Sequence, residues 1–152
     1  RKSMQNQLTY DTTTRKSTSG YVFSVCGGAI SWRSQRQSVV ALASTEVEYV
    51  ALSTATKEMV WLRRLLNDLG FQQKDPTEIK EDNQGAIHLS HNPTHHERTK
   101  HISIKYHFVR EKLEAGEMKL KYCPTDEMVA DAMTKPVTAM KFKSFKTEVG
   151  VE

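Results

Sequence analysis

The sequence predicts a mixed α/β domain, and three observations support this fold class. Its 152 residues are 38% hydrophobic and 26% charged, which suits one globular domain with a substantial core. Segments with the two-residue period of strands alternate along the chain with segments that have the period of helices. Their order is strands, helix, strand, two helices, strand and helix, which favours a layered α/β architecture.

A β-hairpin is predicted near the N-terminus. β-branched and aromatic residues surround the Gly27-Gly28 pair, which is typical of a tight turn between antiparallel strands. The predicted strands cover about residues 20–26 and 29–34. The segment before them, "LTYDTTTRKSTSG", contains a single acid, Asp11, which is either a catalytic carboxylate or an ordinary turn residue.

A long helix is predicted from Ser44 or Thr45 to Leu69. A capping hydroxyl begins it, and Gly70 stands where glycine commonly ends a helix. Glu48 heads its apolar stripe, which continues through Leu52, Ala55, Met59, Leu62, Leu66 and Leu69. A carboxylate on a core face is costly unless it is paired, protonated or bound to a cation. The alternative is a surface acid that favours the helix dipole in the first turn.

The C-terminal half alternates strands and helices. Asp82 lies between a strand and a helix, where ligand sites cluster in open α/β sheets and where Asp is also a favoured helix cap. Asp131, taken alone, is an ordinary solvated helix residue. The predicted elements are a strand over about 77–81, a short helix that ends before Pro93, a helix over about 101–115, a half-buried strand through Met118, Leu120 and Tyr122, a short helix over about 126–134 and a C-terminal helix or tail over 137–152.

Composition and spacing argue against several protein classes. Cys26 and Cys123 lie far apart, and His88 and His91 lack an acidic or Cys partner at ligand spacing, which argues against a zinc site or a disulfide framework. The chain has no GxSxG turn and no phosphate-binding glycine loop. No apolar run approaches the roughly 20 residues of a membrane span, and no signal-peptide pattern begins the chain. We therefore expect a soluble, intracellular protein without a membrane partner.

The positive charge is concentrated near the N-terminus. The net charge is +4, and residues 1–40 carry six Lys or Arg against one acid, which favours a polyanionic partner. Arg33 and Arg36 after the hairpin, with Asn83 and Gln84 beside Asp82, are candidate phosphate contacts. The alternative for the arginines is a solvated strand edge.

Five ordered motifs lie between about Arg15 and Pro136, namely "RKSTSGYVF", "GGAISWRSQRQ", "ALASTEVEYVALSTATKEMVWLRRLLNDLG", "EDNQGAIHLSHNPTHHERTKHISIKYHFVREKL" and "YCPTDEMVADAMTKP". Together they resemble the ribonuclease H domain of copia-type LTR retrotransposon Pol polyproteins. The resemblance implies the ribonuclease H-like fold, a five-stranded mixed sheet flanked by helices. It also implies an endonuclease that cuts the RNA strand of RNA–DNA hybrids during reverse transcription.

The resemblance also implies a metal site. In that family four carboxylates hold two Mg²⁺ ions, with Mn²⁺ as an alternative, and the ions activate water and stabilise the leaving oxygen. Carried over by motif, the catalytic and metal-binding acids are Glu48 of "STEVEY", Asp82 of "EDNQ" and Asp131 of "VADAMTK". The implied partners are RNA–DNA hybrid and the reverse transcriptase and integrase portions of the same polyprotein. The implied location is the cytoplasm, in a virus-like particle, and the nucleus.

The first acid of the family's pattern is absent. Counted back from Arg15 without gaps, the two acids of a "DAD" segment fall on Gln5 and Gln7, and Asp11 falls after the strand as a turn residue. Glutamine is neutral and a poor Mg²⁺ ligand. We therefore expect residues 1–14 to form a degenerate, incomplete first strand and turn, 15–136 to form the ribonuclease H-like domain and 137–152 to follow as a helix or tail.

Three functional hypotheses remain. The first is a ribonuclease H that hydrolyses the RNA of hybrids by two-metal catalysis, impaired by the loss of its first Asp. The second is a catalytically inactive retrotransposon remnant that at most binds nucleic acid. The third is a structural α/β interaction module with no role on nucleic acid.

Overall fold

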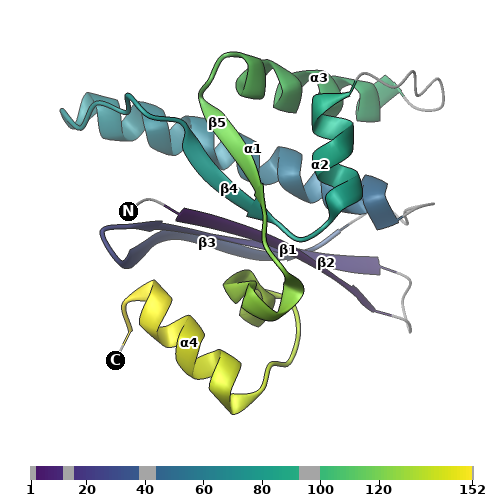
Figure 1. Ribbon diagram of the computed structural model, residues 1–152, viewed down its shortest axis with the longest axis vertical. Helices are drawn as coiled ribbons and strands as arrows, with labels where there is room; N and C mark the ends of the chain where they lie inside the picture. The colour runs from purple at the N-terminus through teal and green to yellow at the C-terminus, as the bar shows by residue number, and fades with distance from the viewer. Residues whose placement is uncertain (1–2, 12–15, 38–43, 93–99, 152) are drawn as a thin grey trace.

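A five-stranded sheet forms the centre of the protein in a computed structural model that describes residues 3–11, 16–37, 44–92 and 100–151 (Figure 1). Its strand order is β3-β2-β1-β4-β5. β1, β2 and β3 pair antiparallel, whereas β1, β4 and β5 run parallel. The strands are β1 (Ser3–Asp11), β2 (Lys16–Val25), β3 (Gly28–Arg36), β4 (Thr77–Glu81) and β5 (Met118–Tyr122).

Helices cover both faces of this sheet (Figure 1). One face carries α1 (Ser44–Asp68), α2 (Gln84–His91) and α3 (Lys100–Glu114). The other face carries two short 3₁₀ helices, η1 (Thr125–Glu127) and η2 (Val129–Met133), and α4 (Ala139–Val149). Across the described ranges, no helix has the length and apolar character needed to cross a bilayer. The predicted mixed α/β architecture is confirmed.

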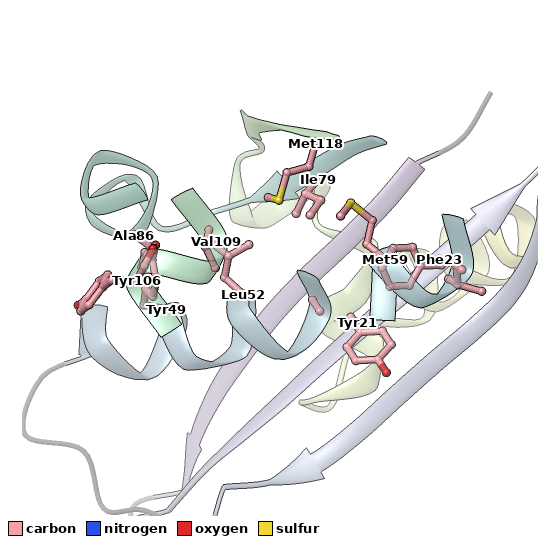
Figure 2. Close-up of a cluster of buried hydrophobic side chains, with 12 residues drawn as sticks. Tyr21, Phe23, Tyr49, Leu52, Met59, Ile79, Ala86, Tyr106, Val109 and Met118 are labelled. Carbon is pink, nitrogen blue, oxygen red and sulfur yellow. The ribbon is translucent and has the colours of Figure 1, made fainter. Parts of the chain in front are cut away.

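The main core lies between the sheet and the helices α1, α2 and α3 that cover one of its faces, which we call the α1 face (Figure 2). The predicted stripe of α1 is buried from Leu52 to Leu62, but Leu69 is 63% exposed. Leu69 follows the last residue of α1, and Gly70 turns the chain away with a φ of +86°. The core residues are Tyr21, Phe23, Tyr49, Leu52, Ala55, Met59, Leu62, Ile79, Ala86, Tyr106, Val109 and Met118.

The α4 face has a smaller core. Cys123, Met128 and Ala130 form its buried cluster. Gly20 of β2 lies directly under this layer, because a Cβ built on it would come within 2.8 Å of Met133 Cβ and of Thr134 Cγ2. A residue without a side chain therefore allows η2 and the residue after it to pack close to the sheet.

Three expectations about the first strand and the C-terminal region are wrong. β1 is nine residues long and pairs with β2 over its whole length, so the strand itself is not short, and only its pairing with β4 is limited to two positions. Asp11 is the last residue of β1, paired with Lys16, rather than a turn residue after the strand. The helix expected over 126–134 is two 3₁₀ helices, because Met128 between them is extended. Residues 139–149 form a helix, which Thr138 caps.

Candidate metal centre and nucleic-acid groove

Glu48 lies near the start of α1, on the face that packs against the sheet. Its side chain is 9% exposed, and within the described residues its Oε2 has no hydrogen-bond partner. The pKa of Glu48 is raised to about 9, first by burial and then by the negative charges of Glu81 and Asp82, against the positive charge of Lys135. The predicted position on the core face is confirmed, and an ionised Glu48 requires a nearby cation.

Glu81 and Asp82 stand at the end of β4. Thr77, Ile79 and Glu81 are the buried residues of this strand, because alternate side chains point to the same face. Glu81 is fully buried, and its Oε1 accepts a hydrogen bond from the backbone N–H of Asn83 at 3.2 Å. Asp82 is half-buried, and its Oδ2 accepts a hydrogen bond from Thr125 Oγ1 at 3.0 Å.

The helix cap that follows β4 is Asn83 rather than Asp82. The side-chain oxygen of Asn83 accepts a hydrogen bond from the backbone N–H of Ala86 at 3.0 Å and caps α2. The capping alternative for Asp82 is therefore wrong. The pKa of Asp82 is raised by burial and, to a smaller extent, by the charge of Asp131, while the hydrogen bond from Thr125 opposes the rise.

Three carboxylates converge at the junction of α1 and β4. One carboxylate oxygen from each of Glu48, Glu81 and Asp82 lies within 4.8 Å of the other two. Hard oxygen ligands suit Mg²⁺, and the buried, unpartnered Oε2 of Glu48 leaves a lone pair for a cation. The three side chains therefore fit a hard divalent ion. Sequence reasoning found Glu48 and Asp82 but missed Glu81, although the alternation from Ile79 would have placed it inward.

Asp131 is not part of this three-carboxylate group and is ion-paired with two lysines. It lies in η2 and is 1% exposed. Lys135 Nζ approaches its Oδ1 to 2.9 Å as an ion pair without directed hydrogen-bond geometry, and Lys141 Nζ of α4 contacts its Oδ2. Asp131 is near enough to influence Asp82 electrostatically. The structure thus groups two of the three predicted acids, and gives the third a pair of cations that the sequence did not predict.

The strand register places the backbone of Gln5 beside the carboxylates. Gln5 of β1 pairs with Lys80, the residue before Glu81, across the parallel ladder. The position predicted for the missing first acid is therefore next to the end of β4. Asp11 lies six residues further along β1, about 20 Å away at the rise of a strand.

The predicted nucleic-acid contacts divide into two places. Arg33 and Arg36 are exposed on β3 and line a groove of about 180 Å³, together with Thr54 of α1 and Lys105 of α3. Three cationic side chains therefore line this groove. The pKa of Lys105 is lowered by burial and by the positive charge of Lys57. Sequence reasoning missed Lys105, because only the fold brings α3 beside β3.

The other two predicted contacts lie beside the carboxylates. Asn83 uses its side-chain oxygen for the α2 cap, and Gln84 is the exposed first residue of α2. Three strand spacings separate β3 from β4 in the sheet, so the groove strand lies about 14 Å from the carboxylate strand. This separation corresponds to a few base steps of a nucleic-acid strand.

Comparisons with curated proteins find retrotransposon polyproteins. The chain is 45% identical over 141 residues to the retrovirus-related Pol polyprotein from transposon TNT 1-94 of Nicotiana tabacum. It is 38% identical over 141 residues to that from transposon RE2 of Arabidopsis thaliana. Both alignments cover 93% of this chain, which spans about 10% of the length of each relative. No protein-family model matches the chain.

Comparison with solved structures identifies the fold. The structure of LC11-RNase H1 in complex with RNA/DNA hybrid matches with a TM-score of 0.61, over 88% of this chain and 94% of that chain. The two sequences are 11% identical, so the match concerns the fold alone. It confirms the ribonuclease H-like fold that the motifs implied.

Proposed function

We propose that this chain, which has a ribonuclease H-like fold and is similar to part of retrotransposon Pol polyproteins, hydrolyses the RNA strand of RNA–DNA hybrids with reduced, metal-dependent activity. The observation that carries this proposal is the convergence of one carboxylate oxygen from each of Glu48, Glu81 and Asp82 within 4.8 Å, where Glu48 also has a buried Oε2 without a hydrogen-bond partner in the described part of the chain. We propose reduced activity because neutral Gln5 stands beside β4 where the family's first acid is expected.

Each part of the site has a proposed role. Glu48, Glu81 and Asp82 hold Mg²⁺, or Mn²⁺ as an alternative, and the bound ion supplies activation of water and stabilisation of the leaving oxygen. Asp131 was the third ligand implied by the motifs, but its ion pairs with two lysines oppose that role. Thr125 orients Asp82 through its hydrogen bond.

The groove supplies the proposed contacts to nucleic acid. Arg33, Arg36 and Lys105 bind backbone phosphates with little dependence on base sequence, and Gln84 contacts the strand near the carboxylates. We also propose that the domain works beside the reverse transcriptase and integrase portions of a Pol polyprotein, in a cytoplasmic virus-like particle and in the nucleus.

The second candidate function is nucleic-acid binding without cleavage. It is favoured by the neutral residue at Gln5 together with the neutralisation of Asp131 by Lys135 and Lys141. In this case the groove keeps its cations while the site does no chemistry. The two functions share a substrate and differ only in turnover.

A cleavage assay separates the two functions. The 152-residue chain is incubated with a hybrid labelled on its RNA strand, in Mg²⁺ and in Mn²⁺, beside Glu48→Gln and the matched control Glu46→Gln on the same helix. We expect slow cleavage that Glu48→Gln abolishes and Glu46→Gln preserves. Gln5→Asp is expected to increase the rate, because it adds a carboxylate beside β4.

Two outcomes reject the cleavage proposal. If the unmodified chain cuts no faster than buffer, or if Glu48→Gln cuts equally fast, the carboxylates do not support hydrolysis. Hybrid binding that weakens steeply with added salt then supports the binding-only function. The absence of binding at low salt supports the third hypothesis, an interaction module.

A further inference from the structure

With Glu48 ionised, the state that holds a cation, the described side chains of the site carry two more negative than positive charges. The acids are Glu48, Glu81, Asp82 and Asp131, and the cations are Lys135 and Lys141. Gln5, beside the end of β4, adds no charge. One divalent ion balances this arrangement, whereas a second would leave an excess of positive charge in a poorly solvated site.

The acids differ in how their charge is compensated. The carboxylate of Asp131 is 1% exposed and has an ammonium group on each oxygen. Glu48 is 9% exposed, and no described lysine or arginine forms an ion pair with it; its Oε2 has no hydrogen-bond partner among the described residues, and one of its carboxylate oxygens lies within 4.8 Å of oxygens of Glu81 and Asp82. A cation can therefore bind at the carboxylate of Glu48, whereas the carboxylate of Asp131 is already paired with the ammonium groups of Lys135 and Lys141.

Lys141 is held at Asp131 by the packing of α4. Its Nζ also donates a hydrogen bond to the backbone oxygen of Thr125 at 2.7 Å, and Thr125 Oγ1 donates to Asp82. α4 begins at the cap Thr138, whose Oγ1 accepts from the backbone N–H of Lys141 at 3.3 Å. Its far end meets the β2–β3 turn, since a Cβ on Gly150 would come within 2.9 Å of the Gly27 oxygen.

We infer that this site binds one divalent cation, held by Glu48, Glu81 and Asp82, and that the ammonium group of Lys141 takes the place of a second ion at Asp131. The inference rests on the proposed function for the presence of an ion, and it departs from the two-ion site that the motifs imply. It assigns Glu81 as a metal ligand and Lys141 as the residue that sets the number of ions.

The test counts bound ions in the absence of nucleic acid. Mn²⁺ is titrated into the metal-free 152-residue chain, and free Mn²⁺ is measured by electron paramagnetic resonance. We expect one ion per chain. Lys141→Met is expected to bind the first ion more tightly and to admit a second, weaker ion, because it removes a positive charge from Asp131. The matched control is Lys143→Met, an exposed lysine on the same helix, which should behave as the unmodified chain.

A second pair of variants tests the ligand assignment. Glu81→Gln should weaken the first ion by about 10- to 100-fold, the range for loss of a group that supports a metal site. Glu78→Gln removes an acid from the opposite face of β4, where Glu78 pairs with Lys119 and Lys121, and should leave Mn²⁺ affinity unchanged. Circular dichroism of each metal-free variant confirms that it is folded.

Several results overturn the inference. Two ions in the unmodified chain exclude a permanent ammonium at Asp131, and no ion at all excludes the three-carboxylate site. If a folded Lys141→Met protein binds the same number of Mn²⁺ ions with the same affinity, Lys141 does not set the number of ions. If Glu81→Gln and Glu78→Gln change the Mn²⁺ affinity equally, Glu81 is not a metal ligand. One bound ion with no hybrid cleavage would reject the proposed hydrolysis while leaving this inference intact.

Discussion

The two faces of the sheet hold their carboxylates by different means. On the α1 face, Glu48 continues a core stripe that packs with Tyr49, Leu52 and Ile79, and no ion pair reaches it from the described residues. On the α4 face, Asp131 lies beside a cluster of three small or medium side chains and is ion-paired twice. The comparison teaches that packing can hold a carboxyl group in place without a counter-ion, at the cost of a raised pKa, whereas the smaller core holds a carboxylate through its counter-ions.

The largest expected effect tests whether the α1 core holds the carboxylates. Leu52→Ala removes a fully buried side chain one turn after Glu48 and should cost about 2–5 kcal/mol of unfolding free energy, measured by urea denaturation. The control Leu69→Ala lies past the end of α1, where 63% exposure limits the cost to about 0.5 kcal/mol. Equal costs would show that the stripe is not the structural support of this face.

The next prediction concerns the carboxyl group of Glu48, which has no counter-ion among the described residues of the α1 face. The pKa of Glu48 is raised from its ordinary value of 4.5 to about 9 in the folded protein, by burial and by the charges of Glu81 and Asp82, against the charge of Lys135. Between these values the unfolded chain has lost a proton that the folded chain keeps, so the free energy of unfolding falls as pH rises. In metal-free buffer, Glu48→Gln should remove this loss and be more stable by about 3 kcal/mol at pH 7.

Thermal unfolding at several pH values measures that difference. The advantage of Glu48→Gln should vanish near pH 4, where the carboxyl is protonated in both states, and Glu46→Gln should show no such trend. Added Mg²⁺ should stabilise the unmodified chain and reduce the advantage, since an ion that binds only the folded state adds stability. A gap between the two proteins that does not change with pH would contradict a raised pKa at Glu48.

The same contrast explains what the sequence could predict. β5 follows from its two-residue alternation, and α1 follows from its stripe and Gly70, because these signals are local; β4 was expected over the same residues, although its alternation was not used. Glu81 was within reach of that reasoning, since it shares the face of Ile79. Lys141 was not, because its contact with Asp131 joins η2 to a helix that the sequence left as a helix or tail. The sequence therefore predicted the packing of the α1 face, whereas the ion pairs of the α4 face could be found only in the tertiary structure.

A smaller effect is expected from the contact between the α4 face and the sheet. Gly20→Ala would bring a Cβ within 2.8 Å of Met133 Cβ and Thr134 Cγ2, so the segment that carries Asp131 must shift, at a cost of about 1–2 kcal/mol. Gly28→Ala is the control, because its Cβ would meet no atom closer than 3.9 Å. Urea denaturation of both variants measures the difference, and a Gly20→Ala protein as stable as the control would show that η2 adapts freely.

The smallest expected effect tests which face of the protein binds nucleic acid. Lys105→Met removes a cation from the groove on the α1 face, whereas Lys143→Met removes one from α4, so the two variants have the same net charge. If phosphates lie in the groove, Lys105→Met should weaken hybrid binding for all sequences alike and lower the slope of log affinity against log salt by about 1. Lys143→Met should leave that slope unchanged. Equal losses in the two variants, measured by fluorescence anisotropy over a salt series, would mean that the hybrid responds to total charge rather than to this groove.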